Sequence, residues 1–404
     1  MRVLHVAAMP FPTAQGTQAA VHRMVEALAR AGHDAHLLTY ARGAFEREAA
    51  YTHHRATDLP GREGFRSGPS VRKIGLDALF AARVAVLARR LRPAHVVAHH
   101  VEAAAACVVA GVPFHFVAHT SLEAELPSYV RRAWPRPVLS RAGRAVDHAV
   151  LARARSAGVV CPDLRSLLPN ATHATVLPVP WAVTAPEVER RDARRALGIG
   201  ENDEVVLYAG NLDAYQGWEV PNDAVAELAR ARPRLRFLVA TESDAAPLFR
   251  RAEAHGVCAR LRRTLLTPDA ARLRAMAAAD VVAVPRRAPG GLPIKLLDAL
   301  AAGVPVVAER RAAAGFELGD AAHFVSNDDP RAFARGLAAV LVAPAARTAL
   351  AERGRAYVRD HHSDAAYLDA YSAFTSPAFT DASFTDTESH AAPHDSAHAP
   401  FAAH

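Results

Sequence analysis

Apolar positions form short buried runs that alternate with longer stretches of helical period, and this alternation occurs twice along the chain. Each predicted strand is followed by a predicted amphipathic helix, which is typical of parallel α/β domains. Strands are expected at 2–8, 35–39, 95–100, 112–118 and 158–161 in the first series, and at 204–210, 235–241, near 261, 281–284, 304–307 and within 320–330 in the second, while 41–72 is expected to be rich in loops. The stretch between the two series is extended and punctuated by prolines, so we interpret it as a linker.

These boundaries predict two Rossmann-like domains. A helix follows them, which we expect to cross back to the first domain, and then a small, polar, aperiodic tail that we expect to be disordered. The predicted segments are 1–171 (N-terminal domain), 172–187 (linker), 188–361 (C-terminal domain), 362–375 (C-terminal helix) and 376–404 (tail).

The strongest candidate for chemistry is a β-loop-α-β unit at 283–308, AVPRRAPGGLPIKLLDALAAGVPVVA. Its glycines precede a helix expected at 292–302, where the helix dipole and unpaired backbone N–H groups favour an anion such as a diphosphate. Asp298, roughly two turns into that helix, is placed to accept hydrogen bonds from a ribose. The alternative is a crossover helix on which Lys295 and Asp298 form an ordinary surface ion pair.

The first domain offers a second set of candidates at the carboxyl ends of its strands, where open parallel sheets bind ligands. Gly16 lies in the loop after the first strand, but the loop lacks G-x-G-x-x-G, which disfavours a dinucleotide. His99, His100 and His119 end two further strands. A single strand-end histidine is more often structural, whereas several at one sheet edge favour a site.

The chain is basic, with a net charge of +7 and a pI near 9.7. Lys73 and Lys295 are its only lysines, so the charge comes from arginine. Two explanations of the basic charge are open. One is a coding bias toward arginine. The other is a surface that binds acidic lipid or a phosphorylated substrate through the cluster Arg131, Arg132, Arg136, Arg141 and Arg144. No nucleic-acid-reading motif is present, so we do not expect a nucleic-acid partner.

The sequence also bears on location. The three cysteines have no metal-ligand spacing and are expected to be reduced core residues. The first strand is too short for a signal peptide, and no run approaches the roughly 20 apolar residues of a membrane span. We therefore expect a cytoplasmic protein, with any membrane contact peripheral and at the inner face.

In detail, residues 1–374 resemble the family 4 retaining glycosyltransferases, which have the GT-B architecture of two Rossmann-like domains facing a cleft. The matching pieces, in order, are the loop around Gly16, the strand-end His119, AGNLDAYQG at 209–217, AADVVAVP at 278–285, and PGGLPIKLLDALAAGVPVVA. NLDAYQ and PGGLPIKLL correspond to a subgroup with NLDxYQ and PGxPxKLL motifs. Their order and spacing together carry the resemblance.

The resemblance implies transfer of a sugar from a nucleoside-diphosphate sugar to an acceptor hydroxyl with retention, and a role in cell-envelope polysaccharide biosynthesis. In the E-x7-E pattern of the family, Asp298 takes the place of the second, ribose-binding acid and Gly290 that of the first. Asn211 and Gln216 stand where the family tends to carry a basic pair on the diphosphate. Charge-assisted bonds to phosphate are about twice as strong as neutral ones, so we expect Arg286 and Arg287 to supply the missing charge.

The roles implied by the resemblance divide between the two domains, with the N-terminal domain binding the acceptor and the C-terminal domain the nucleotide-sugar. Catalytic roles are assigned to His119 and Asp298. Donor binding is assigned to Gly16, Thr17, Gly210, Asn211, Gln216, Thr241, Glu242, Arg286, Arg287, Gly290, Gly291, Leu292 and Pro293, and acceptor binding to His100 and Glu102. Neither a metal nor a cofactor is expected, since the nucleotide-sugar is itself the donor substrate.

Two other functions remain open on the same architecture. One is a non-hydrolysing nucleotide-sugar epimerase, which would turn over a free nucleotide-sugar without an acceptor. The other is a catalytically degenerate GT-B protein that binds a nucleotide or glycan as a partner subunit. Gly290, Asn211 and Gln216, which depart from the family pattern, support this second alternative.

Overall fold

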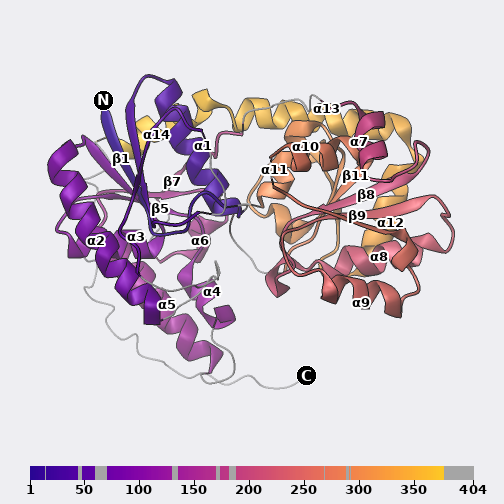
Figure 1. Cartoon of the computed structure of the whole chain (residues 1–404), viewed down its shortest axis with the longest axis horizontal. Helices are drawn as coiled ribbons and strands as arrows, with labels where there is room; N and C mark the ends of the chain where they lie inside the picture. The colour runs from indigo at the N-terminus through magenta and orange to yellow at the C-terminus, as the bar shows by residue number, and fades with distance from the viewer. Residues whose placement is uncertain are drawn as a thin grey trace, which may run out of the picture.

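The computed structural model describes residues 1–13, 15–43, 48–59, 71–129, 135–169, 173–181, 188–267, 269–287, 291 and 293–376. They form two α/β domains side by side, each with a parallel sheet covered by helices (Figure 1). The N-terminal domain contains β1 (Arg2–Ala7), α1 (Gly16–Arg30), β2 (Asp34–Thr39), β3 (Thr52–Arg55), α2 (Val71–Leu91), β4 (His95–His99), α3 (His100–Val109), β5 (His115–Ala118), α4 (Leu122–Tyr129), α5 (Arg136–Leu151), β6 (Ala157–Val159), α6 (Leu164–Leu167) and β7 (Thr175–Val176).

The second domain repeats the alternation of strand and helix and ends in three consecutive helices. It contains α7 (Arg190–Ala196), β8 (Glu204–Ala209), α8 (Glu219–Ala229), β9 (Leu235–Ala240), α9 (Ala246–Ala254), β10 (Leu261–Thr264), α10 (Asp269–Ala278), β11 (Val281–Val284), α11 (Ile294–Ala302), β12 (Val306–Glu309), β13 (His323–Val325), α12 (Pro330–Val342), α13 (Pro344–His361) and α14 (Asp364–Thr375).

The two sheets share one topology. The first has the order β3-β2-β1-β4-β5-β6-β7 and the second β10-β9-β8-β11-β12-β13, with parallel pairing throughout. In each sheet the chain first moves outward on one side and then returns to add strands on the other. The order therefore reverses between β1 and β4 and again between β8 and β11. Ligands of open α/β sheets bind beyond the carboxyl ends of strands at such reversals.

The sequence-based prediction missed two strands and shifted a third. Thr52–Arg55 forms β3 inside a region predicted as loop, because this edge strand is polar and shows no apolar alternation. Thr175–Val176 forms β7 beside β6, so the predicted linker start at 172 was wrong. Strand β12 covers Val306–Glu309 and extends past the predicted 304–307 to include a buried glutamate.

The last helix does cross back to the N-terminal domain, as predicted. Figure 1 shows α14 beside β1 and α1, while α13 runs along the C-terminal domain. Arg30 on α1 donates two hydrogen bonds to the carboxylate of Asp364, at 2.9 and 3.1 Å. Tyr367, Tyr371 and Phe374 of α14 are buried. The predicted tail lies, apart from residue 376, outside the described residues.

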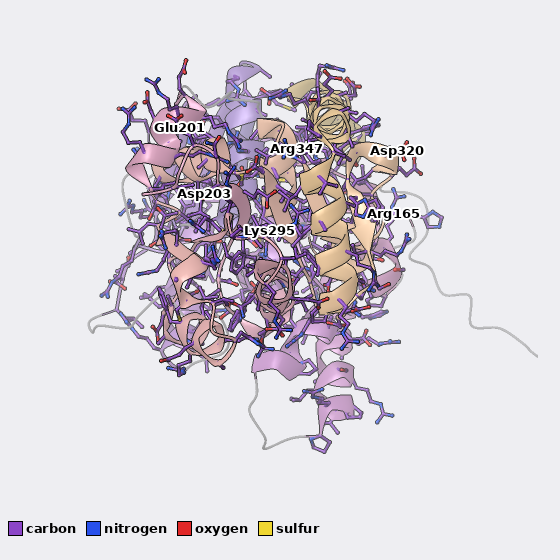
Figure 2. The ribbon with its side chains drawn as sticks, turned by 90° about the vertical axis from the view of Figure 1, so that its right-hand side faces the viewer. Arg165, Glu201, Asp203, Lys295, Asp320 and Arg347 are labelled. Carbon is purple, nitrogen blue, oxygen red and sulfur yellow. The ribbon has the colours of Figure 1, made fainter. Side chains whose placement is uncertain are left out.

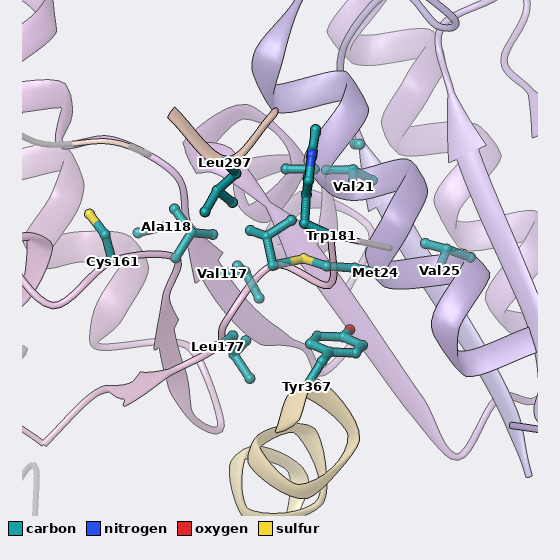
Figure 3. Close-up of a cluster of buried hydrophobic side chains, with 14 of the residues drawn as sticks. Val21, Met24, Val25, Val117, Ala118, Cys161, Leu177, Trp181, Leu297 and Tyr367 are labelled. Carbon is teal, nitrogen blue, oxygen red and sulfur yellow. The ribbon is translucent and has the colours of Figure 1, made fainter. Parts of the chain in front are cut away.

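One apolar cluster spans the junction of the two domains. Figure 3 shows Met24 of α1, Val117 of β5, Trp181, Leu297 of α11 and Tyr367 gathered together. The guanidinium of Arg23 lies over the Trp181 ring, 4.3 Å from its centroid. Because side chains from both domains, the connection and α14 pack into one core, the start of α11 has a defined position against the N-terminal domain.

Two sequence-based expectations concern membranes and cysteines. Among the described residues, no single helix is long and apolar enough to cross a membrane, although α12 with the following α13–α14, bent by 101°, passes that test as a pair on length and composition alone. Cys107 and Cys161 are buried as expected, whereas Cys258 is exposed and is not a core residue.

Candidate functional site

The predicted site residues converge on the strand-order reversals of the two sheets. Gly16 follows β1, His100 and His119 follow β4 and β5, and Gly210 follows β8. The loop between β11 and α11 completes this set. Both sheets direct these loops toward the domain junction, so segments far apart in the sequence meet there.

The N-terminal end of α11 packs directly against the N-terminal domain. Gly291 has φ +77°, and a Cβ at this position would lie 3.0 Å from Nη2 of Arg286 and 3.3 Å from the carbonyl oxygen of His119. A Cβ on Gly16, the first residue of α1, would lie 3.0 Å from Cγ1 of Ile294. The positive φ favours glycine at position 291, and at position 16 a larger residue would meet Ile294 at close contact distance. Gly290 and Leu292 lie outside the described residues.

Other predicted donor contacts adjoin this junction. Thr17 follows Gly16 in the first turn of α1, and Pro293 is the N-cap residue of α11. The backbone amide of Gly291 lies close to the thiol of Cys161, whose pKa is raised to about 11 by burial and lowered in part by that amide.

Lys295 is the cation of this site. It is 8% exposed, in the first turn of α11, and Figure 2 shows it near the middle of the C-terminal domain. Its Nζ donates to Oε1 of Gln216 at 2.7 Å and lies 4.4 Å above the ring centroid of Tyr208. A Cβ on Gly210 would lie 3.3 Å from this nitrogen. Burial chiefly, and then the charge of Arg286, lower the pKa of Lys295 to about 7.

Arg286 supplies a second buried cation at the same place. It is 8% exposed, and burial lowers the pKa of its guanidinium. Its backbone N–H donates to Oε2 of Glu309 at 2.8 Å, while Oε1 of that glutamate accepts from the backbone of Asp328 at 2.7 Å. Glu309, fully buried at the end of β12, thus fixes the loop that carries Arg286.

Arg287 is placed differently from its neighbour. Its side chain is 44% exposed and lies 3.5 Å from Glu219 and 3.7 Å from Asp328, measured between nitrogen and carboxylate oxygen. The structure therefore brings Arg286 into the junction and directs Arg287 toward acidic side chains on the surface of the C-terminal domain.

Asp298 is buried behind the start of α11, and the surface ion pair that the sequence left open is absent. Its Oδ1 accepts from Nε1 of Trp181 at 3.0 Å and forms a short ion pair with Arg272 of α10. The charge of Asp298 raises the pKa of Arg272. Oδ2 of Asp298 makes no hydrogen bond with the described residues.

Removing the Asp298 carboxylate should therefore destabilise the fold. We expect Asp298→Leu to lower the free energy of unfolding by up to about 3–5 kcal/mol, because it removes the nearer counter-charge of the largely buried Arg272 guanidinium and leaves only Asp269, at 3.7 Å. Urea denaturation of Asp298→Leu, Arg272→Leu and the double variant measures this. The double variant should be more stable than Asp298→Leu alone, and strictly additive losses would contradict the pairing.

The remaining donor-side candidates shape the loops after β8 and β9. The Asn211 amide donates to the hydroxyl of Tyr215 at 3.0 Å, so it holds its own turn, whereas Gln216 positions Lys295. Thr241 is fully buried, and its hydroxyl oxygen accepts a hydrogen bond from the backbone N–H of Ser243 at 3.1 Å. Glu242 accepts three hydrogen bonds from Leu266 and Thr267, which ties it to the loop after β10.

The acceptor-side candidates lie on the N-terminal domain. His119 is 3% exposed and stacks on His100 with 4.9 Å between ring centroids, and His100 adopts a positive φ of 67°. Glu102 forms a 2.5 Å ion pair with Lys73. Burial alone would raise the pKa of Glu102, but Lys73 outweighs it and the net shift is downward, so this carboxylate is charged.

Sequence reasoning missed three residues that shape the site: Lys295 as a buried cation, Glu309, and Asp147. Asp147, fully buried on α5, accepts hydrogen bonds from the Leu122 and Glu123 amides at 3.3 and 3.1 Å and so orders the chain just after His119. Two sequence features could have pointed to them: Glu309 is an acid at the end of an apolar strand, and Lys295 is one of only two lysines. For Asp147 the sequence offers no signal.

One cavity lies away from the predicted site residues. A cavity of about 560 Å³ lies at the C-terminal end of α11, lined in part by Arg190, Asp280 and Arg347, and contains none of the predicted site residues. Within the described part of the chain, no group of three or more His, Cys, Asp or Glu side chains is arranged to hold a metal ion.

Both halves of the chain match models of glycosyltransferase domains. Residues 14–170 match the model described as Glycosyltransferase Family 4, and residues 189–357 match that described as Glycosyl transferases group 1. Each match covers one of the two domains seen in the structure. Together they support the family 4 glycosyltransferase resemblance of the sequence.

Curated relatives match over part of their length. A D-inositol 3-phosphate glycosyltransferase of Segniliparus rotundus is 28% identical over 176 residues, covering 42% of this chain and 39% of that protein. A phosphatidyl-myo-inositol mannosyltransferase of Mycobacterium tuberculosis is 33% identical over 177 residues, covering 41% and 46%. The chain thus matches less than half the length of either relative.

Solved structures match over nearly the whole chain. Sucrose-phosphate synthase from Thermosynechococcus elongatus has a TM-score of 0.76 at 18% identity, covering 93% of this chain and 98% of that one. The Anabaena protein HepE, solved with UDP and glucose, gives 0.74 at 17% identity, covering 92% and 98%. WaaG, a glycosyltransferase involved in lipopolysaccharide biosynthesis, gives 0.70 at 19%, covering 92% and 99%. The chain has the GT-B fold, as predicted.

Proposed function

We propose that this protein is a glycosyltransferase that moves a sugar from a nucleoside-diphosphate sugar to an acceptor hydroxyl with retention of anomeric configuration. The observation that carries the proposal is the pair of buried cations, Lys295 and Arg286, at the N-terminal end of α11 beside Gly210 and Gly291. Buried cations of like charge repel, and their placement at a helix N-terminus is favourable when an anion lies between them.

This pair also answers the main departure of the sequence from the family pattern. Gln216 stands where a basic residue is typical, and the ammonium of Lys295 is hydrogen-bonded to the Gln216 side chain at 2.7 Å. Lys295 of α11 thus places a positive charge next to the turn after β8, where the family pattern has a basic residue. A diphosphate bound here receives charge-assisted hydrogen bonds, and the free oxygen of Asp298 receives the ribose.

The proposed mechanism relies on positioning and on stabilisation of the leaving group. The C–O bond between the sugar and the diphosphate breaks as the acceptor oxygen attaches on the same face, and the departing phosphate oxygen takes the acceptor proton. Lys295, Arg286 and the amides at the start of α11 stabilise the negative charge that develops on the diphosphate. This scheme needs neither a metal nor a cofactor beyond the donor.

The acceptor is proposed to be a glycan, a lipid-linked sugar or a small molecule bound by the N-terminal domain near His100 and Glu102. Arginines exposed on α5, among them Arg136 and Arg141, are proposed to bring the cytoplasmic protein to acidic lipid at the inner face of the membrane. Sedimentation with anionic and neutral vesicles tests this, and equal binding to both would remove the lipid proposal.

Calorimetric titration with a panel of UDP-, GDP- and ADP-sugars tests the donor. We expect one base to bind in the micromolar range, with binding unaffected by EDTA. The bound donor is then incubated with candidate acceptors, and the anomeric configuration of the product is read by NMR. An inverted product would contradict the proposed stereochemistry.

The same experiments separate the two alternatives. An epimerase converts the free nucleotide-sugar into its epimer without any acceptor, which NMR of the donor alone detects. A degenerate partner subunit binds the nucleotide-sugar but gives no turnover, and donor hydrolysis in water remains at the uncatalysed rate. Slow acceptor-independent hydrolysis with release of the free sugar supports the transferase.

A further inference from the structure

Three histidines form a hydrogen-bonded ladder across the N-terminal sheet and end at the site. His5 on β1, His99 at the end of β4 and His119 just after β5 lie on adjacent strands. His5 pairs in register with Val97, and His99 with Val117, so each step advances two residues toward the carboxyl edge on one face. Nδ1 of His5 lies 2.9 Å from Nε2 of His99, and Nδ1 of His99 lies 2.9 Å from Nε2 of His119.

The ladder is sealed from solvent at its inner end. His5 and His99 have no exposed surface, and the ring of Tyr371 on α14 stacks on His5 with 6.2 Å between centroids. Nε2 of His5 has no hydrogen-bond partner among the described residues. At the outer end, His119 adjoins Gly291 through its carbonyl oxygen, and its Nδ1 makes no hydrogen bond with the described part of the chain.

All three imidazoles are neutral at ordinary pH. Burial lowers the pKa of His5 to about 3, and burial followed by the neighbouring histidines lowers the pKa of His99 and His119 well below the usual value. A neutral imidazole carries one proton, so it donates through one nitrogen and accepts through the other. The two hydrogen bonds of the ladder must therefore point the same way.

The two directions are not equivalent. If every ring is protonated on Nδ1, the atom left in the apolar interior is the bare Nε2 of His5. In the opposite direction His5 would bury an Nε2–H without an acceptor, and orphaned buried N–H groups are rare in native structures. The first direction therefore prevails, and it leaves His119 with its proton on Nδ1.

We propose that His5 and His99 are positioning residues that fix His119 as a neutral imidazole whose Nδ1–H donates a hydrogen bond to an oxygen of the bound ligand. Within the proposed function, on which this inference rests, that oxygen belongs to a sugar hydroxyl of the donor or acceptor. His119 then orients the ligand and does not act as a general base. A fixed donor also discriminates between ligand oxygens, because it requires a lone pair at its own position.

A second ladder in the same sheet provides a control. His95 and His115 lie at the opposite ends of β4 and β5, with Nδ1 of His95 3.1 Å from Nε2 of His115, and Nδ1 of His115 2.8 Å from the hydroxyl of Ser156. Phe374 of α14 packs on His115 with 5.4 Å between ring centroids. His115 is 3% exposed and is covered by α14, whereas His95 is only partly buried, and this ladder does not reach the site.

Long-range proton–nitrogen NMR on the histidine-labelled full chain reads the tautomer directly, with His119→Gln used to assign the resonances. We expect wild-type His119 to show the Nδ1–H pattern throughout pH 6 to 8. A pattern of Nε2–H, of averaged tautomers or of imidazolium would overturn the proposal. This measurement does not involve catalysis, so it stands or falls separately from the transferase assignment.

Variants of the central histidine test the relay itself. His99→Gln keeps one donor and one acceptor and should retain the Nδ1–H pattern of His119, whereas His99→Phe should give averaged tautomers and lower kcat/KM at least tenfold. His115→Phe, a substitution of equal size in the second ladder, should leave the His119 spectrum unchanged. An unchanged His119 spectrum in a folded His99→Phe would overturn the relay, and so would a spectrum altered equally by His115→Phe.

Discussion

Replacing Lys295 with methionine should weaken binding of the nucleoside-diphosphate sugar by about 100-fold. The substitution keeps an unbranched side chain of similar length in the buried first turn of α11 but removes the charge beside Gly210 and Gln216. Hydrogen bonds to charged groups contribute about 1.5–3 kcal/mol each, and 2.7 kcal/mol is about 100-fold in affinity. Calorimetric titration with the donor sugar identified for the wild type measures the loss.

The same variant should change the pH dependence of binding. Lys295 has a pKa lowered to about 7, so above that pH much of the free protein carries it uncharged, and binding the anion then requires uptake of a proton. Affinity of the wild type should fall as the pH rises from 7 to 9, by up to about tenfold per pH unit. In Lys295→Met this dependence should disappear.

Lys73→Met is the matched control, since Lys73 is the only other lysine of the chain and lies in the N-terminal domain, paired with Glu102. It should leave nucleotide-sugar affinity within about twofold of the wild type. Equal losses in the two variants, or full affinity in Lys295→Met, would show that the diphosphate is bound elsewhere.

Acid should unfold the protein well above the pH at which carboxylates titrate. His5, His99, His115, His119 and His362 are all at most 3% exposed, and burial lowers the pKa of each. Their pKa values are lower in the native state than in the unfolded chain, so the unfolded chain binds more protons below about pH 6.5. Stability is therefore complete above that pH and decreases as the pH falls.

The expected loss between pH 7 and pH 5 is about 2 kcal/mol for each such histidine, which for five approaches the total stability of a typical domain. Thermal melting at pH 7, 6 and 5 measures the decrease, and calorimetry in buffers of different ionisation enthalpy counts the protons taken up on unfolding. His115→Phe should reduce that count by about one. A melting temperature that is constant from pH 7 to pH 5 would contradict these assignments.

Most of the fold follows from local pattern, because each parallel strand is a short apolar run between amphipathic helices. The two Rossmann-like domains and the strand ends that carry Gly16, His119 and Gly210 were predictable in this way, whereas the GT-B architecture, with α14 returning to the first domain, was inferred from the family resemblance. Strands β3 and β7 were not, since both are short, neither shows an alternation of apolar and polar residues, and both are held by pairing with a neighbour rather than by full burial. Strand pairing of that kind produces no local pattern of apolar residues from which the strand could be predicted.

The sequence predicted where the candidate site lies, but not which side chains contact one another there. Motif spacing located the start of α11, yet it assigned the missing charge equally to Arg286 and Arg287, which the fold separates. It considered Lys295 only as the partner of Asp298 in the alternative surface ion pair, whereas the structure buries it beside Gln216. The partner of Lys295, Gln216, lies 79 residues away in the sequence, and only the tertiary fold brings the two together.

The chain crosses between the domains twice, and the two crossing segments, around Trp181 and His362, are hydrogen-bonded to each other. The backbone N–H of Trp181 donates to the carbonyl of His362 at 2.7 Å, and Nδ1 of His362 donates to the carbonyl of Val179 at 2.9 Å. Both hydrogen bonds thus hold the two crossings of the chain together at one point of the domain junction. Because the Trp181 indole also donates to Asp298, that carboxylate is tied to the same point.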